Sequence, residues 1–146
     1  MIWFDNLESF PTASYYVQQL YATNTGTNVL PLTGKDGKPL TGAEGQDGLF
    51  ASAVLDAASG EYVVKVVNTG ESEQPLTINF NGLKKKEGIV GATVTTLHAD
   101  DPMAENSLEN PNAVMPKMER VSIDNRQDWT TVIPAKTFKV YRFQKK

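Results

Sequence analysis

The chain has no cysteine and only one histidine, His98, among its 146 residues. Disulfides, thiolate metal sites, cysteine nucleophiles and any site that needs two histidines are therefore excluded. No apolar run approaches the ~20 residues that span a bilayer. No signal peptide is visible, because Asp5 and Asn6 interrupt the apolar start. We expect no metal site, no cofactor and no membrane segment.

The charge is also small, with a net value of −3. It gives no electrostatic reason to expect nucleic acid or an anionic membrane as a partner. Hydrophobic residues make up 40% of the chain and charged residues 21%, as in soluble globular domains of ordinary size. The compartment stays open: the periplasm or the exterior if a signal has been lost, with the cytoplasm as the alternative.

Residues 1–25 differ in pattern from the rest of the chain. A short apolar run, Ile2–Phe4, is typical of a strand, and Pro11 suits the first turn of a helix. The helix is predicted by apolar residues on one face at Ala13, Tyr16, Val17, Leu20 and Tyr21. A strand and a helix are half of a β/α unit, which cannot bury its faces alone. We therefore expect residues 1–25 to come from a larger α/β domain.

From residue 26 onward, short apolar runs alternate with turn signals. The β-branched run Tyr62–Val67 predicts a strand, and alternation predicts another at Leu76–Phe80. Further strands are predicted at Leu49–Leu55, Val90–Leu97, Met118–Ile123, Trp129–Ile133 and Phe138–Phe143. Strands at roughly ten-residue spacing favour an antiparallel sandwich or barrel.

One long connection, Asp101–Pro116, separates two of these strands and is rich in Asn, Pro and acidic residues. Proline lacks a ladder donor, so the segment is not a core strand. We expect an ordered connection in which Asn106 binds the chain's own backbone. Val114 or Met115 should anchor it in the core or against a neighbouring domain.

Several of these segments, in order, resemble the C-terminal part of α-L-arabinofuranosidases of glycoside hydrolase family 51. The helix Ser14–Tyr21 is similar to the last helix of that family's (β/α)8 barrel, and Ile2–Asn6 to its last strand. The remaining similar stretches are Asp47–Ala53, Lys65–Asn68, Asp101–Pro116 and Pro134–Phe143. Of these, Asp101–Pro116 is the most specific.

The resemblance implies an all-β fold, an antiparallel, jelly-roll-like β-sandwich preceded by a strand and a helix left from the barrel. Residues 1–25 would be the last strand and helix of the barrel, and residues 26–146 the C-terminal sandwich. Family members are retaining exo-hydrolases of terminal α-L-arabinofuranosyl residues, with two catalytic carboxylates about 5 Å apart. Those carboxylates lie on barrel strands outside this chain, so no catalytic residue is assigned here.

The resemblance also implies a role and partners. The domain would be the non-catalytic sandwich of a homo-oligomeric arabinofuranosidase, held on its barrel and meeting arabinose-containing polysaccharide through it. Because the last barrel strand ends at the active site in the family, we expect its edge to be lined by Trp3, Phe4, Asp5 and Asn6.

Two other functions are compatible with the residues alone. A carbohydrate-binding module would present coplanar exposed aromatics, for which Trp3, Trp129 and the tyrosines are candidates. A structural sandwich would pack residues 1–24 into a self-contained fold. The carboxylates at Asp100, Asp101, Glu105 and Glu109 lack EF-hand spacing, so we assign no calcium site. His98 follows a predicted strand, and we expect it to be structural or solvated.

Overall fold

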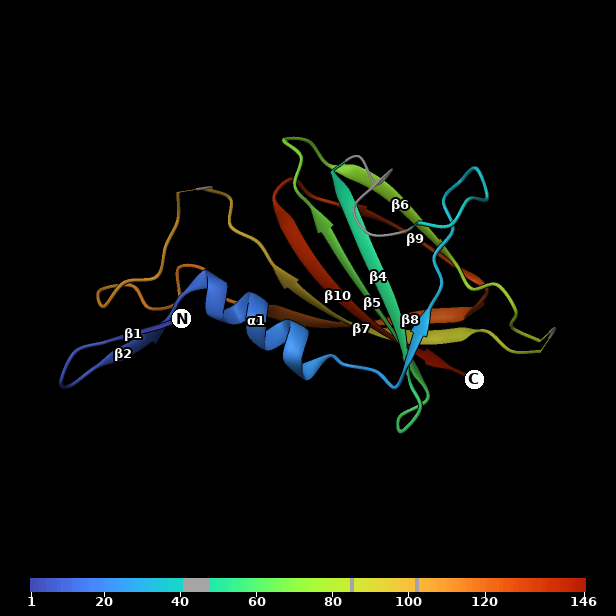
Figure 1. Ribbon diagram of the computed structural model, residues 1–146, viewed down its shortest axis with the longest axis horizontal. Coiled ribbons are helices and arrows are strands. Elements are labelled where there is room, and N and C mark those ends of the chain that lie inside the picture. Colours follow the sequence, from blue (N-terminus) through green and yellow to red (C-terminus); the bar gives the residue numbers. More distant parts are fainter. Residues whose placement is uncertain (41–47, 85, 102) are drawn as a thin grey trace.

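A computed structural model describes residues 1–40, 48–84, 86–101 and 103–146, with the side chain of Asn125 also left out. A large antiparallel sheet forms the body, a two-stranded ribbon lies on one of its faces, and a helix lies on the other (Figure 1). The predicted all-β antiparallel fold with one helix is therefore confirmed. Among the described residues, no helix has the length and apolar character needed to cross a membrane.

Six strands form the large sheet. In spatial order they are β3 (Asn28–Leu30), β4 (Leu49–Asp56), β5 (Glu61–Asn68), β10 (Thr137–Lys145), β7 (Ile89–Leu97) and β8 (Lys117–Arg126). Every neighbouring pair is antiparallel. The central strands β5, β10 and β7 bury residues on both faces, which explains their nearly continuous β-branched and aromatic runs.

The first face of the large sheet is covered by the ribbon of β6 (Gln74–Asn79) and β9 (Asp128–Ile133). At the centre of this core lies Phe143, which is fully buried. Its ring contacts the Phe80 ring edge-to-face, with centroids 4.9 Å apart, and stacks on the Tyr141 ring, with centroids 5.5 Å apart. Trp129 also contacts it, with centroids 6.4 Å apart. These aromatics make the ribbon face a dense apolar core.

The second face carries the helix α1 (Ala13–Thr23). Thr12 caps it, its hydroxyl accepting a hydrogen bond from the Tyr15 N–H at 3.2 Å. Leu20 is buried against the sheet, and Tyr21 stacks on Phe138 with centroids 5.1 Å apart. Of the apolar helix face predicted from the sequence, Ala13, Tyr16 and Leu20 pack on the sandwich, whereas Val17 and Tyr21 stay partly exposed.

The connection from α1 to β3 passes close over β4 at Gly26. A Cβ atom at this position would lie 2.6 Å from Val54 Cγ2. Only glycine permits such a close approach without a shift of the neighbouring chain, so Gly26 helps to hold the helix against the sheet.

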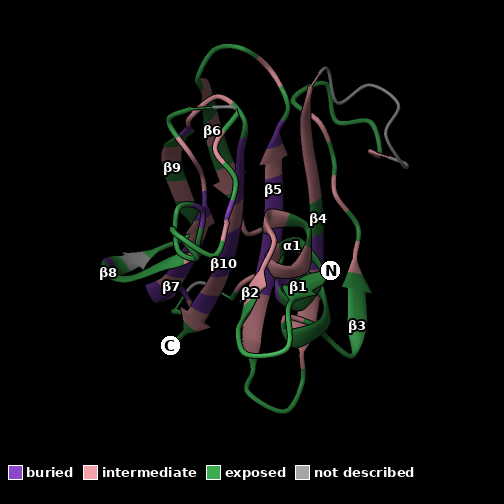
Figure 2. Cartoon of the chain, turned by 90° about the vertical axis from the view of Figure 1, so that its left-hand side faces the viewer, coloured by how far each residue is buried: buried purple, intermediate pink, exposed green. Residues whose placement is uncertain are grey.

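The N-terminal residues form a hairpin rather than a strand followed directly by a helix. The strand β1 (Ile2–Phe4) pairs antiparallel with β2 (Ser9–Pro11). The prediction that Pro11 opens the helix is therefore wrong, because Pro11 ends β2 and the helix begins two residues later. A two-stranded ribbon has free edges on which the missing proline N–H costs nothing. The hairpin extends away from the sandwich, and its exposed residues are green in Figure 2.

Candidate functional site

The four residues predicted for the edge of an active site lie in the projecting hairpin. Trp3 and Phe4 are in β1 and expose 62% and 76% of their surface. Asp5 begins the turn, where its carboxylate accepts hydrogen bonds from the N–H groups of Leu7 and Glu8, both at 2.8 Å. The structure therefore brings the four residues to one exposed hairpin.

The hydrogen bonds of the hairpin turn make Asp5 unsuited to act as a general acid. The backbone hydrogen bonds from Leu7 and then Glu8 lower the pKa of Asp5. A general acid needs a raised pKa so that it holds its proton at neutral pH. Asp5 is instead held ionised, as a carboxylate that shapes the turn, and it does not suit proton donation.

The long connection is tied to this hairpin by Asn106, which is 6% exposed. Its amide oxygen accepts the Val114 N–H at 2.7 Å, and its amide nitrogen donates to the Val114 carbonyl at 2.9 Å. The same nitrogen donates to the Pro11 carbonyl at 2.7 Å. The prediction that Asn106 binds the chain's own backbone is confirmed, and the bond to Pro11 also joins the hairpin to the connection.

The connection is ordered at its described residues between β7 and β8, as predicted. Val114 is 5% exposed and belongs to the core beneath α1, which confirms the predicted anchor. Met115, the other candidate, is 42% exposed. Asp101 accepts the Met103 N–H at 2.8 Å, a local turn of the kind that Asp favours. Pro102 lies outside the described residues.

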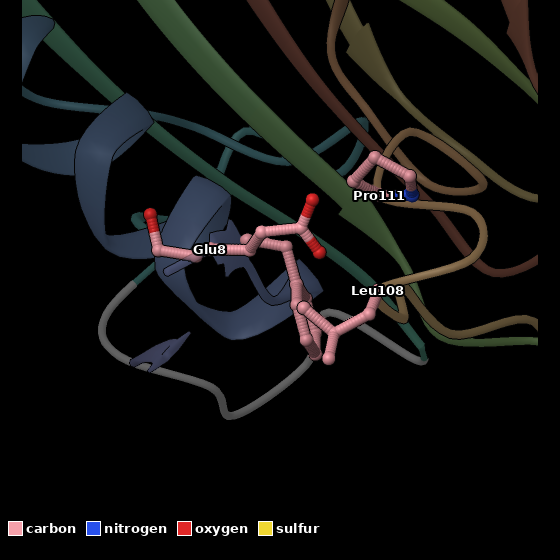
Figure 3. A pocket seen from close by; sticks show the side chains of 5 residues that line it. Glu8, Leu108 and Pro111 are labelled. Carbon is pink, nitrogen blue, oxygen red and sulfur yellow. The ribbon is translucent and has the colours of Figure 1, made fainter. Parts of the chain in front are cut away.

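A shallow pocket of about 250 Å³ lies where the hairpin meets the connection (Figure 3). It is lined by Glu8, Ser9, Phe10, Leu108 and Pro111. Its walls come from two segments about 100 residues apart in the sequence, which the Asn106 bond to Pro11 holds together. The pocket places one carboxylate beside apolar surface.

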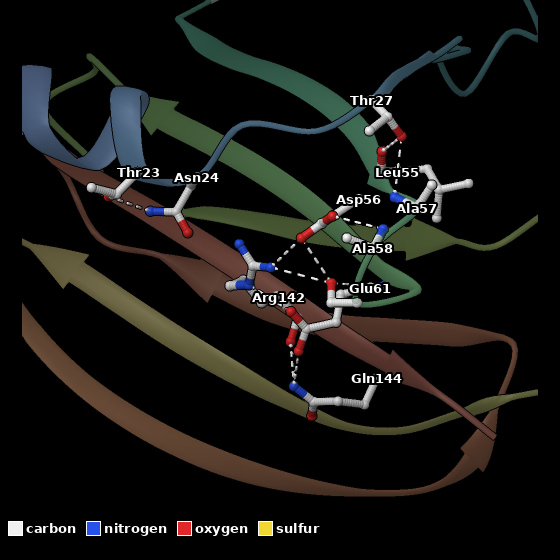
Figure 4. A network of polar contacts seen from close by, with 11 residues as sticks. Thr23, Asn24, Thr27, Leu55, Asp56, Ala57, Ala58, Glu61, Arg142 and Gln144 are labelled. Atoms are coloured by element: carbon white, nitrogen blue, oxygen red, sulfur yellow. Dashed lines mark hydrogen bonds and ion pairs between the residues drawn. The ribbon is translucent and has the colours of Figure 1, made fainter.

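A polar network lies on the helix-bearing face of the large sheet, centred on Arg142 (Figure 4). Its Nε donates to Glu61 Oε2 at 2.6 Å, and its terminal Nη2 donates to Asp56 Oδ2 at 2.8 Å. Gln144 donates to the other Glu61 oxygen at 2.8 Å. The hydrogen bonds from Ser59 and then Arg142 lower the pKa of Asp56. At Glu61, burial raises the pKa, but the hydrogen bonds from Gln144 and Arg142 outweigh it, so the pKa of Glu61 is also lowered.

The remaining polar candidates have structural positions. His98 Nδ1 lies 2.8 Å from the Thr137 hydroxyl oxygen, and its Nε2 lies 3.3 Å from Asp100. This contact joins the end of β7 to the start of β10, as a structural histidine would. Within the described parts of the chain, no three His, Asp or Glu side chains group so that they would hold a metal ion.

The aromatic candidates for sugar binding are distributed over separate parts of the molecule. Trp3 is in the hairpin, whereas Trp129 is half-buried in the ribbon core against Phe143. Tyr21 stacks on Phe138, and Tyr16 packs edge-on to Tyr15. A coplanar exposed platform needs rings on one surface, whereas Trp3 lies exposed in the hairpin and Trp129 and Tyr21 are packed on opposite faces of the large sheet.

Sequence reasoning missed the Arg142 network. Arg142 lies in the alternating run Phe138–Phe143, and its carboxylate partners lie 81 and 86 residues earlier. The available signal was the charged Arg142 between the aromatic residues Tyr141 and Phe143, since a half-buried charge needs a partner.

Comparison with known proteins gives consistent matches. The sequence profile described as the alpha-L-arabinofuranosidase C-terminal domain matches residues 1–136. The chain is 29% identical over 137 residues to alpha-L-arabinofuranosidase 2 of Arabidopsis thaliana, covering 92% of this chain and 19% of that protein. It is 29% identical over 126 residues to the probable alpha-L-arabinofuranosidase A of Aspergillus flavus, covering 85% of this chain and 17% of that protein. The chain thus spans about a fifth of the length of these relatives.

Solved structures show the same fold. The arabinose-bound MgGH51 α-L-arabinofuranosidase superimposes with a TM-score of 0.80 at 23% identity, covering 99% of this chain and 21% of that one. The α-L-arabinofuranosidase of Thermotoga maritima superimposes with a TM-score of 0.74 at 22% identity, covering 97% of this chain and 30% of that one. At these identities the likeness is one of fold, and it includes the hairpin and α1 as well as the sandwich.

Proposed function

Because the chain belongs to the family of α-L-arabinofuranosidase C-terminal domains, we propose that it is the non-catalytic sandwich of such an enzyme, held against a catalytic (β/α)8 barrel. The enzyme containing it would remove terminal α-L-arabinofuranosyl residues from arabinan or arabinoxylan with retention of the anomeric configuration. That chemistry needs a carboxylate pair about 5 Å apart. Asp5 does not suit either role, since its carboxylate is held in the hairpin turn by the Leu7 and Glu8 N–H groups.

The observation that supports docking most strongly is the apolar surface of the hairpin. Ile2, Trp3 and Phe4 expose 49%, 62% and 76% of their surface, and Leu7 exposes 93%. Large apolar side chains gathered in one short hairpin and left exposed indicate an interaction surface in a soluble protein. A catalytic barrel against this hairpin would remove that surface from water.

The hairpin also carries the proposed contribution to the active site. We propose that Trp3, Phe4, Asp5 and Asn6 line its edge in the longer enzyme, with the aromatic rings bounding the arabinose-binding region. Residues 1–25 would then belong to the barrel and residues 26–146 to the sandwich. The burial of Leu20 against the sheet supports a helix shared by both units. The homo-oligomeric state of the longer enzyme stays a prediction.

Activity measurements test this function. The purified 146-residue chain should not hydrolyse 4-nitrophenyl α-L-arabinofuranoside, whereas the longer enzyme containing it should. In that enzyme, Trp3→Ala should raise KM more than the exposed Val29→Ala control, since Val29 lies at the far edge of the sheet. Turnover by the purified chain alone, or a longer protein with no arabinofuranosidase activity, would overturn the proposal.

A further inference from the structure

The central strand β5 carries a lysine that, among the described residues, has no carboxylate or hydrogen-bond partner. Lys65 is 8% exposed and lies on the face of the sheet that bears α1. Its Nζ lies 5.3 Å from the centre of the Tyr21 ring, and among the described residues no acceptor or carboxylate is paired with it. Burial, and then repulsion from Arg142, lower its pKa. A buried ammonium without a partner is unfavourable, so this position calls for an anion.

The chain's own carboxylates on this face are already committed. Lys65 lies opposite Ser52 on β4 and Val140 on β10, and Arg142 occupies the next position on that face of β10. Arg142 binds Glu61 at 2.6 Å and Asp56 at 2.8 Å. These two carboxylates balance the two cations in number, but both are hydrogen-bonded to the guanidinium. Within the part of the chain that the structure describes, Lys65 is left with the Tyr21 ring alone.

The flank of α1 beside this lysine is apolar and open. Val17 and Tyr21 lie one helical turn apart, so they share a flank of the helix. They expose 36% and 44% of their surface, although Leu20 next to them is buried. Ser52, opposite Lys65 on β4, is exposed as well. An apolar flank with an unpaired cation at its base is suited to a second amphipathic helix that carries a carboxylate.

We propose that a helix of the catalytic domain packs beside α1, covers Val17 and Tyr21, and places an Asp or Glu carboxylate against Lys65 Nζ. This inference rests on the proposed function, because the occupant belongs to the catalytic domain. The occupant continues the helix layer that α1 begins on this face. The ion pair fixes the orientation of the two domains, since a misplaced helix leaves the ammonium unpaired.

Removal of the Lys65 charge should shift the melting midpoint in different directions in the 146-residue chain and in the longer enzyme. Lys65→Met keeps the length of the side chain and removes the charge. In the 146-residue chain, the melting midpoint stays unchanged or rises, because an unpaired buried cation is lost. In the longer enzyme, the midpoint of the unit that contains the sandwich falls by several degrees, because the carboxylate loses its partner. The control Lys117→Met, on the exposed edge strand, leaves both midpoints unchanged.

A midpoint that falls equally in both proteins would overturn the proposal, since it would show a structural contact with Tyr21 alone. An unchanged midpoint in the longer enzyme would do the same. If Lys65→Met does not fold, a crystal structure of the unmodified longer enzyme decides, with a carboxylate oxygen expected within ~4 Å of Lys65 Nζ.

A second copy of this chain, or solvent, over Lys65 in that crystal structure would also contradict the proposal. A longer enzyme that hydrolyses arabinofuranosides while Lys65 stays unpaired refutes this inference only. Absence of that activity refutes the proposed function itself.

Discussion

The two faces of the large sheet are built differently. The ribbon face is closed by aromatic packing around Phe143, which is fully buried. The helix face is closed by a smaller apolar core around Leu20, and beside it lie the Arg142 network and the unpaired Lys65. The ribbon face is thus covered by the chain's own apolar side chains, whereas we propose that the helix face, with the exposed hairpin next to it, contacts a neighbouring domain.

The largest effect is expected at the centre of the ribbon face. Phe143→Ala should lower the free energy of unfolding by about 4 kcal/mol, since it removes a fully buried ring in contact with three other aromatics. Chemical denaturation measures this change. The control Val132→Ala, on the exposed side of β9, should have a much smaller effect. Equal effects would show that the ribbon does not close a core.

The next effect is expected where the connection meets the hairpin. Asn106→Ala should cost about 2 kcal/mol, because it leaves the buried N–H and carbonyl of Val114 without partners. Asn112→Ala, at an exposed position of the same connection, serves as the control in thermal unfolding. If both variants melt together with the unsubstituted chain, the connection is not held by Asn106.

A smaller change in stability is expected at the Arg142 network, and it should depend on pH. The pKa of Glu61 lies below its ordinary value of 4.5 and that of Asp56 below 3.8. Groups with lowered folded pKa values stabilise the fold fully above about pH 5 and lose this contribution as the pH falls through the lowered values.

Glu61→Gln should therefore cost about 1 kcal/mol at pH 7, after allowance for solvent screening, and progressively less towards pH 3. Denaturation series at both pH values measure the difference. A deficit that grows in acid would contradict the assigned direction of the pKa shift.

The smallest effect is expected in the hairpin. Because Phe4 is 76% exposed, Phe4→Ala should change the stability of the 146-residue chain by no more than about 0.5 kcal/mol. In the longer enzyme the same substitution should lower the melting midpoint, because the ring would be covered by the barrel. A large loss in the short chain would mean that the hairpin is part of a self-contained fold.

The sequence predicted individual strands better than it predicted how they pair. The strands of the core were predicted well, because β-branched runs such as Tyr62–Val67 and alternation such as Leu76–Phe80 report local burial directly. The strand Ser9–Pro11 was missed, because three residues that end in proline carry almost no periodic signal. The pairing of β6 with β9 was also not predicted, because no local pattern encodes contacts between strands so distant in sequence.

The site was predicted only in part for the same reason. Asn106 was identified as a backbone-binding residue because Asn in a Pro-rich connection favours such contacts. Its bond to Pro11 joins residues 95 positions apart and has no local signature. The Arg142 network and the isolation of Lys65 depend on which strands are neighbours, and so they required the structure.

We propose that the hairpin and the helix face together form the docking surface of this domain. Amide hydrogen exchange, compared between the 146-residue chain and the same residues in the longer enzyme, tests it most directly. We expect the amides of Ile2–Phe4 and Ser9–Phe10 to exchange more slowly in the longer enzyme, and those of β6 and β9 to exchange equally in both proteins. Slower exchange confined to β6 and β9, with the hairpin unchanged, would contradict it.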